Sequence, residues 1–193
     1  MRLYCLGDSL TWGEGVHRSQ VWTGLLAAES GWEVINCGVS GDTTGGMLVR
    51  LQPILGSVKQ DPAESTVLLL GGSSDILYSG TDQTARANLG AMVQQLLAAG
   101  VLPLVGLPLP IDSANAPKTL RSVLDFENAA WVQQDYLNWT RKFCCALGVP
   151  VIDFASLFVD GSGELRHDLL LDGLYPNPEG HQKMAALLKK TLL

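Results

Sequence analysis

Short apolar runs and longer amphipathic stretches alternate along most of this chain. Continuous apolar runs are typical of strands that are buried on both faces of a sheet. The predicted strands are Leu3–Leu6, Glu33–Cys37, Thr66–Leu70, Leu102–Leu107 and Val151–Ile152. Stretches with helical spacing follow them, at Gln20–Ser30, Thr44–Leu55, Thr84–Ala99, about Val123–Leu147 and Pro178–Leu192. Strands that alternate with helices predict a parallel sheet with helices on both faces.

This order of elements predicts an α/β fold, a three-layer α/β/α sandwich around a five-stranded parallel sheet. No internal repeat, linker or low-complexity stretch divides the chain, so residues 1–193 are expected to form a single domain. The longest irregular segment is Pro108–Arg121, directly after the fourth predicted strand. A loop of this length in a compact domain is usually a lid or a binding loop, and a plain surface crossover is the alternative.

Composition narrows the class of protein. Hydrophobic residues make up 47% of the chain and charged residues 17%, which is typical of a globular protein, and the net charge of −6 argues against a nucleic-acid partner. The apolar run after Arg2 is too short for a signal peptide, and no run is long enough for a membrane span. Cys5, Cys37, Cys144 and Cys145 show neither disulfide nor zinc spacing. We therefore expect core cysteines in a reducing cytoplasm.

A serine follows the first predicted strand in the segment Gly7-Asp8-Ser9-Leu10. Open parallel sheets bind their ligands at the carboxyl ends of their strands, which makes Ser9 a candidate nucleophile. Three further polar blocks are expected at the same edge, at residues 36–44, 70–75 and 172–178. The acidic residues beside these positions, Asp8, Asp42 and Asp75, are predicted to accept backbone N–H groups in tight turns.

These four blocks, in this order and spacing, resemble those of the SGNH (GDSL-type) hydrolases, a family of esterases, lipases and acyl or acetyl hydrolases. The resemblance extends from residue 2 to the last predicted helix. It implies a flavodoxin-like SGNH hydrolase fold, a small-molecule ester substrate and Ser9 as nucleophile. It also implies an oxyanion hole made by the N–H groups of Ser9 and Gly41 with the side chain at Ser74, and a base oriented by Asp172. No metal or organic cofactor is implied.

Two positions depart from the family pattern: Ser74 stands where the family has asparagine, and Tyr175 where it has the histidine base. A serine hydroxyl is a weak nucleophile until a base takes its proton. Imidazole titrates near neutral pH, whereas a phenol has a pKa near ~10 and is a poor base at pH 7. Loss of the base in a comparable triad costs on the order of 10⁶ in kcat. Removal of one oxyanion donor costs about 10²–10³.

The sequence therefore predicts a serine ester hydrolase, an acyl or acetyl esterase or a lysophospholipase-like enzyme, whose turnover is impaired or absent. His17, His167 and His181 are its three histidines, and we expect them to be surface or structural residues rather than a substitute base. Two alternatives remain. One is a non-catalytic protein that binds an ester, an acid or a sugar, with Tyr175 inside the pocket. The other is a flavodoxin-like phosphate or nucleotide binder, although its glycine fingerprint is missing.

Overall fold

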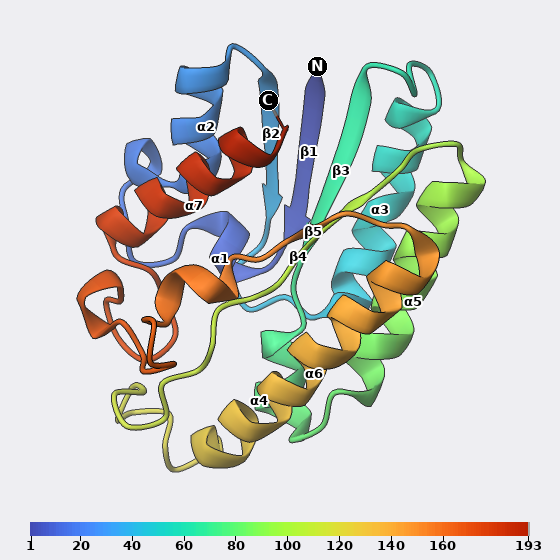
Figure 1. The fold of residues 1–193 in the computed structure, drawn as a ribbon. Coiled ribbons are helices and arrows are strands. Elements are labelled where there is room, and N and C mark those ends of the chain that lie inside the picture. Colours follow the sequence, from blue (N-terminus) through green and yellow to red (C-terminus); the bar gives the residue numbers. More distant parts are fainter. Residues whose placement is uncertain (193) are drawn as a thin grey trace.

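A computed structural model describes residues 1–192, and it confirms the predicted parallel sheet (Figure 1). The strands lie in the order β2-β1-β3-β4-β5, and every neighbouring pair is parallel. Their bounds are β1 (Arg2–Gly7), β2 (Glu33–Gly38), β3 (Ser65–Leu70), β4 (Leu104–Gly106) and β5 (Val151–Ile152). The chain reverses its direction of travel across the sheet between β2 and β3, so the carboxyl ends of β1 and β3 flank a ligand-binding edge.

Helices cover both faces of the sheet, which gives the predicted three layers (Figure 1). One face is covered by α2 (Trp22–Ser30) and α7 (Pro178–Leu192), which pack against each other, and the other by α3 (Thr44–Val58), α5 (Gln83–Ala98) and α6 (Phe126–Leu147). Alternate residues of β1 supply the two cores. Leu3 and Cys5 pack on the α2 and α7 side, whereas Tyr4 and Leu6 pack on the α3 side.

The differences from the prediction lie at short elements and at element ends. Two short helices, α1 (Ser9–Trp12) and α4 (Ser73–Ser79), and the 3₁₀ turns η1 (Arg18–Gln20), η2 (Ala155–Phe158) and η3 (His167–Leu169) were not predicted. The fourth strand is shorter than expected, since it begins only after Pro103, which has no N–H to donate. Helix α6 begins at Phe126 because Asp125 caps it, accepting the Asn128 N–H at 3.0 Å.

The junction between β3 and α4 needs glycine. Gly72 has a φ of +119°, and a Cβ there would lie 2.6 Å from the ring of Tyr136. The buried Tyr136 hydroxyl donates to the Gly71 carbonyl at 3.1 Å, which fixes this turn against α6. The serines that begin α4 are thereby held at the edge of the sheet. None of the helices in residues 1–192 is long and apolar enough to cross a membrane.

Candidate active site

A cavity of about 190 Å³ lies at the carboxyl edge of the sheet, and four of the predicted site residues line it. They are Ser9, Gly41, Ser74 and Tyr175, contributed by four separate segments of the chain. The rest of the wall is mostly apolar: Leu10, Ser73, Leu77, Tyr78, Leu109, Ile111, Leu120, Val123, Leu124 and Leu174. A few polar groups in the lining of an otherwise hydrophobic cavity are the usual form of a small-molecule site.

Ser9 owes its position to a tight turn at the end of β1. Asp8 accepts the Leu10 N–H through Oδ1 at 3.0 Å, and the Asp8 carbonyl accepts the Trp12 N–H at 2.9 Å. The Ser9 N–H donates to no protein group within residues 1–192, and neither does the Gly41 N–H. Gly41 reaches this position with a φ of +74°, a conformation that favours glycine. Two backbone donors are therefore available at the cavity.

Tyr175 is half-buried beside the Ser9 hydroxyl. Burial raises the pKa of its phenol, the Ser9 side chain partly offsets that rise, and the charges of Glu14, Asp172 and Asp8 add to it. The phenol is therefore neutral at physiological pH and carries a proton that it can donate. It has no tendency to accept the proton of a serine hydroxyl.

Asp172 lies at the start of the turn that carries Tyr175. Its Oδ1 accepts the N–H groups of Leu174 at 2.8 Å and Tyr175 at 3.0 Å, so it shapes the turn that carries Tyr175. The residue borders a neighbouring hollow of about 330 Å³, together with Asp112 and His167, and does not line the Ser9 cavity. Asp172 thus fixes the backbone turn that carries the side chain at position 175.

No histidine within residues 1–192 lines the cavity of Ser9. His17 caps η1, where its Nδ1 lies 2.8 Å from the Ser19 Oγ. The Nδ1 of His167 lies 2.8 Å from the buried Asp112 carboxylate, on the neighbouring hollow. His181 is fully buried and accepts the Trp22 N–H at 3.3 Å. These positions agree with the expectation of surface or structural histidines.

The burial of His181 makes stability depend on pH. Burial lowers its pKa from 6.5 to about 4, and its Nε2 has no hydrogen-bond partner in the described structure. The unfolded chain therefore binds this proton more readily than the folded one. The stability from neutral His181 is fully present above pH 6.5 and is lost as the pH falls toward about 4.

The variant His181→Gln isolates this effect, because glutamine keeps an acceptor for Trp22 but does not titrate. We expect the stability of the unaltered chain relative to this variant to fall by about 1 kcal/mol per pH unit between pH 6.5 and 4. Urea unfolding of both proteins across this range measures the difference, in which the other titrating groups cancel. A difference that stays constant with pH would contradict the assignment.

The turn that carries Gly41 is held by Arg50 of α3. The Arg50 guanidinium donates to the Gly7 carbonyl at 2.8 Å, to the Cys37 carbonyl and to the Asp42 carboxylate, with its Nε 2.9 Å from Asp42 Oδ2. One side chain thus ties the ends of β1 and β2 to the loop beside them. Sequence reasoning missed this residue, because nothing in the local pattern marks an arginine that reaches three carbonyl and carboxylate groups.

The acidic residues beside the site accept backbone N–H groups, as predicted. Asp42 accepts the Thr43 N–H at 2.9 Å, and Asp75 accepts both the N–H and the hydroxyl of Thr44, at 2.8 and 2.7 Å. Asp75 thereby fixes the start of α3 next to the Gly41 turn. Asp8 differs in that its Oδ2 is buried without a partner, and desolvation raises its pKa to about 7, with the charges of Asp75 and Asp42 contributing.

The Pro108–Arg121 segment, predicted as a lid or a crossover, contributes three apolar side chains to the cavity: Leu109, Ile111 and Leu120. Gln133 of α6 links this segment to α4, since its Nε2 donates to the Leu109 carbonyl at 2.7 Å and to the Ser73 Oγ at 2.8 Å. The sequence analysis assigned no role to Ser73 or Gln133. A polar residue on the buried stripe of α6 was the one available signal for Gln133.

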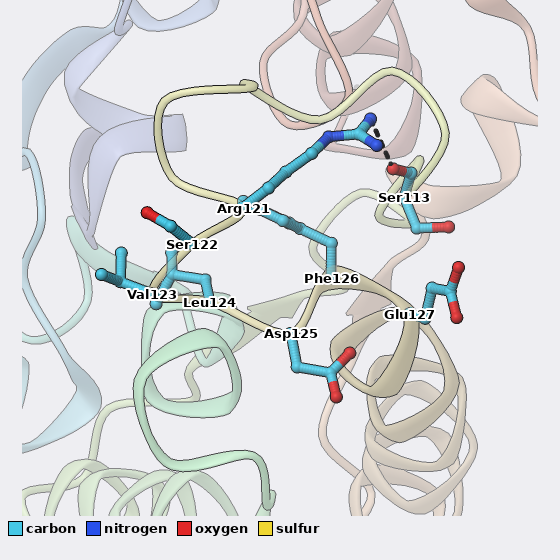
Figure 2. A pocket seen from close by; sticks show the side chains of 8 residues that line it. All are labelled: Ser113, Arg121, Ser122, Val123, Leu124, Asp125, Phe126 and Glu127. Atoms are coloured by element: carbon cyan, nitrogen blue, oxygen red, sulfur yellow. Dashed lines mark hydrogen bonds between the residues drawn. The ribbon is translucent and has the colours of Figure 1, made fainter.

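A second, larger hollow of about 470 Å³ adjoins the cavity at the start of α6 (Figure 2). It contains Arg121, which makes it a candidate anion site. However, the Arg121 side chain extends toward Ser113 of its own loop and donates to the Ser113 carbonyl (Figure 2). It also donates to the carbonyls of Ala114 and Ala116. The carboxylates of Asp125 and Glu127 face the same hollow. The Arg121 guanidinium is thus already hydrogen-bonded to the protein backbone, so within residues 1–192 this hollow offers an anion no free cation.

Comparisons with known proteins identify the family of this chain. Residues 5–183 match the model of the GDSL-like lipase/acylhydrolase family. Over 180 residues the chain is 37% identical to esterase TesA of Pseudomonas aeruginosa, covering 90% of this chain and 79% of that protein. Over 193 residues it is 34% identical to thioesterase 1/protease 1/lysophospholipase L1 of Escherichia coli K12, covering 98% of this chain and 82% of that protein.

Solved structures show the same fold at lower identity. A member of the lipolytic protein G-D-S-L family from Veillonella parvula superposes with a TM-score of 0.82 at 22% identity, covering 98% of this chain and 97% of that one. The aryl esterase of M. smegmatis superposes with a TM-score of 0.78 at 20% identity, covering 99% and 97% of the two chains. The arrangement of sheet and helices is thus shared with known ester hydrolases.

Proposed function

Because this chain belongs to the GDSL-like lipase/acylhydrolase family, we propose that its cavity is the site of a serine ester hydrolase in which the catalytic base has been replaced. Ser9 would be the nucleophile, the N–H groups of Ser9 and Gly41 with the Ser74 hydroxyl would form the oxyanion hole, and Asp172 would support the base position at Tyr175. The observation that carries the proposal is the shared cavity, in which two unpaired N–H groups and the Ser74 side chain meet Ser9.

The chemistry follows from these groups. The Ser9 Oγ would attack the carbonyl carbon of an acyl ester, and the carbonyl oxygen would become an oxyanion held by the three donors. The alcohol would leave with a proton, and water would then release the acid from the acyl–serine ester. Each of the two steps needs a group that takes a proton from the attacking oxygen and returns it to the leaving one. Tyr175 stands in the place of that group.

The Tyr175 phenol cannot take a proton from the Ser9 hydroxyl near neutral pH. A tyrosine with a pKa near ~10 is ionised to about one part in 10³ at pH 7, and the raised pKa of Tyr175 makes that fraction smaller still. The fold and the two backbone donors of the oxyanion hole are present, but no base in the described part of the chain activates Ser9. We therefore infer weak or absent turnover by the unaltered chain.

Hydrolysis of p-nitrophenyl hexanoate by the unaltered chain and by Ser9→Ala tests this inference. The two rates are expected to differ by less than about tenfold, because a serine without a base adds little to the catalysis that the oxyanion hole and binding supply. The absorbance of the released p-nitrophenolate gives the rates, with circular dichroism as a control for folding. A fast reaction that Ser9→Ala abolishes would show that another base acts on Ser9.

A second candidate function is ligand binding without turnover, on the same fold. It is favoured by the combination of retained donors with a neutral phenol in the cavity. The apolar wall supports an acyl ligand over a sugar, because a sugar would leave its hydroxyl groups without partners there. The net charge of −6 supports a small molecule rather than a nucleic acid. A cytoplasmic location stays a prediction, supported by four cysteines that form no disulfide.

A further inference from the structure

We propose that the cavity binds an aliphatic carboxylate of about six carbons, and that it prefers this acid to the corresponding ester. The inference rests on the proposed function only in taking the cavity of Ser9 as the site. It goes further in naming the ligand and in assigning the Tyr175 hydroxyl as one of the groups that bind it.

The lining of the cavity offers more hydrogen-bond donors than an ester can use. The N–H groups of Ser9 and Gly41 make no hydrogen bond within the protein, and the hydroxyls of Ser74 and Tyr175 line the same cavity. A carboxylate has two oxygens and about four acceptor positions, and it has no proton to donate. An ester presents one good acceptor, its carbonyl oxygen. Four donors in the lining of one cavity therefore match an acid anion better than an ester.

Tyr175 changes what the site selects. A neutral imidazole at this position would direct an acceptor nitrogen at Ser9, and a lone pair there repels a bound anion. The phenol of Tyr175, kept neutral by burial, lines the cavity and has a proton that it can donate to a ligand. Hydrogen bonds to a charged acceptor are about twice as strong as those to a neutral one. The replacement that removes the base thus adds a donor for an anion.

The negative charges near the cavity weaken the binding of a carboxylate but do not prevent it. Its wall contains no lysine, arginine or histidine, and the carboxylates of Asp172 and Glu14 lie close enough to influence Tyr175. Asp172 is already bound to two N–H groups, and Glu14 to the Ser40 hydroxyl. Asp8 is largely protonated below pH 7, since its pKa is raised to about 7. We therefore expect moderate affinity, strongest in slightly acid solution, where Asp8 is neutral and the ligand is still ionised.

The size of the cavity sets the length of the chain. A volume of 190 Å³ holds roughly six groups of the size of a water molecule, at about 30 Å³ each. Beyond that length the ligand would pass Val123 and Tyr78, whose side chains are 73% and 60% exposed. Each methylene buried inside strengthens binding about fourfold, and one outside adds little. Affinity is thus expected to rise from butyrate to hexanoate and then to level off.

Isothermal titration calorimetry at pH 6 with butyrate, hexanoate, octanoate and decanoate tests the proposal, with methyl hexanoate and 1-hexanol as uncharged controls. We expect hexanoate to bind at least tenfold more tightly than either control. Equal or tighter binding of the methyl ester would overturn the preference for an acid. Failure of all the carboxylates to bind, or equal affinity for butyrate and octanoate, would overturn the proposed ligand.

The variant Tyr175→Phe tests the assigned donor. It is expected to weaken hexanoate binding by about tenfold or more and to leave methyl hexanoate almost unaffected, because only the anion uses the phenol proton fully. Tyr4→Phe is the matched control, since Tyr4 lies in the core and does not line the cavity. Unchanged hexanoate affinity in Tyr175→Phe would contradict the assignment.

Binding and hydrolysis are measured separately, so the two proposals can fail independently. If Tyr175→His hydrolyses esters through Ser9 while the unaltered chain ignores hexanoate, the hydrolase site stands and the carboxylate site is wrong. If hexanoate binds but a folded Tyr175→His stays inactive, the carboxylate site stands and the hydrolase site is wrong. The ligand series is measured on the unaltered chain, so it tests the proposal even if Tyr175→Phe misfolds.

Discussion

Tyr175→His is expected to raise kcat for p-nitrophenyl hexanoate by about 10³-fold or more. The full effect of a base in a serine triad is on the order of 10⁶, and part of it needs an acid that orients the imidazole. The Oδ2 of Asp172 makes no hydrogen bond within residues 1–192, so it is available for that role, while Oδ1 holds the turn. The neighbouring Ser9 hydroxyl already lies beside the side chain at position 175.

Further variants and the pH profile test whether the gain in kcat comes from a histidine base that acts on Ser9. Ser9→Ala in the Tyr175→His background should remove it, and Tyr175→Phe, which supplies no base, should show none. The rate of Tyr175→His should rise with pH through a pKa near ~6.5, as expected for a histidine base. Adding Ser74→Asn should raise the rate further, by up to about 10². A folded Tyr175→His without Ser9-dependent hydrolysis would contradict the assignment of position 175.

Arg50→Met is expected to lower the free energy of unfolding by about 3 kcal/mol. Methionine preserves the packing of the alkyl chain but leaves the carbonyls of Gly7 and Cys37 and the Asp42 carboxylate without the guanidinium. Each lost hydrogen bond costs about 1 kcal/mol, and one to a charged group costs more. The Arg50 side chain is 27% exposed, so water replaces only part of the loss. Urea denaturation measures the change.

Arg86→Met is the matched control for this substitution. Arg86 pairs with Asp82 one turn earlier in α5 and has a similar exposure of 33%, but it contacts no strand end. A local pair of this kind contributes about 0.3–0.5 kcal/mol. Because Arg50 also holds the Gly41 turn, Arg50→Met should weaken hexanoate binding, whereas Arg86→Met should not. Equal and small losses of stability in both variants would show that Arg50 is an ordinary surface residue.

The regular part of the fold could be predicted because its signals are local. Leu3, Tyr4, Cys5 and Leu6 form a continuous apolar run, and this is what a strand covered on both faces requires. The helices α1 and α4 were missed because they are 4 and 7 residues long, too short for a periodic pattern. Their serines could still be placed, since Ser9 and Ser74 follow strands whose ends must meet at one edge.

The parts of the site that were missed depend on contacts between distant residues. Arg50 reaches Gly7, 43 positions away, and Gln133 reaches Ser73, 60 positions away. No pattern in a single sequence records such pairs. Asp172 was among the predicted site residues through the family resemblance, but the contacts of its Oδ1 with the N–H groups of Leu174 and Tyr175 come from the turn between them. The conformation of a turn decides whether a side chain hydrogen-bonds to the backbone or faces the cavity, and a sequence pattern does not record that conformation.

The most direct test of the central claim, that Ser9 lies in a hydrolase site without its base, is covalent labelling by diethyl p-nitrophenyl phosphate. This reagent phosphorylates a serine only when its hydroxyl is activated and its oxyanion hole is formed. Intact-mass measurement against time should show almost no labelling of the unaltered chain and rapid labelling of Tyr175→His, in each case absent after Ser9→Ala. Rapid labelling of the unaltered chain at Ser9 would contradict the account, because Ser9 would then possess a base.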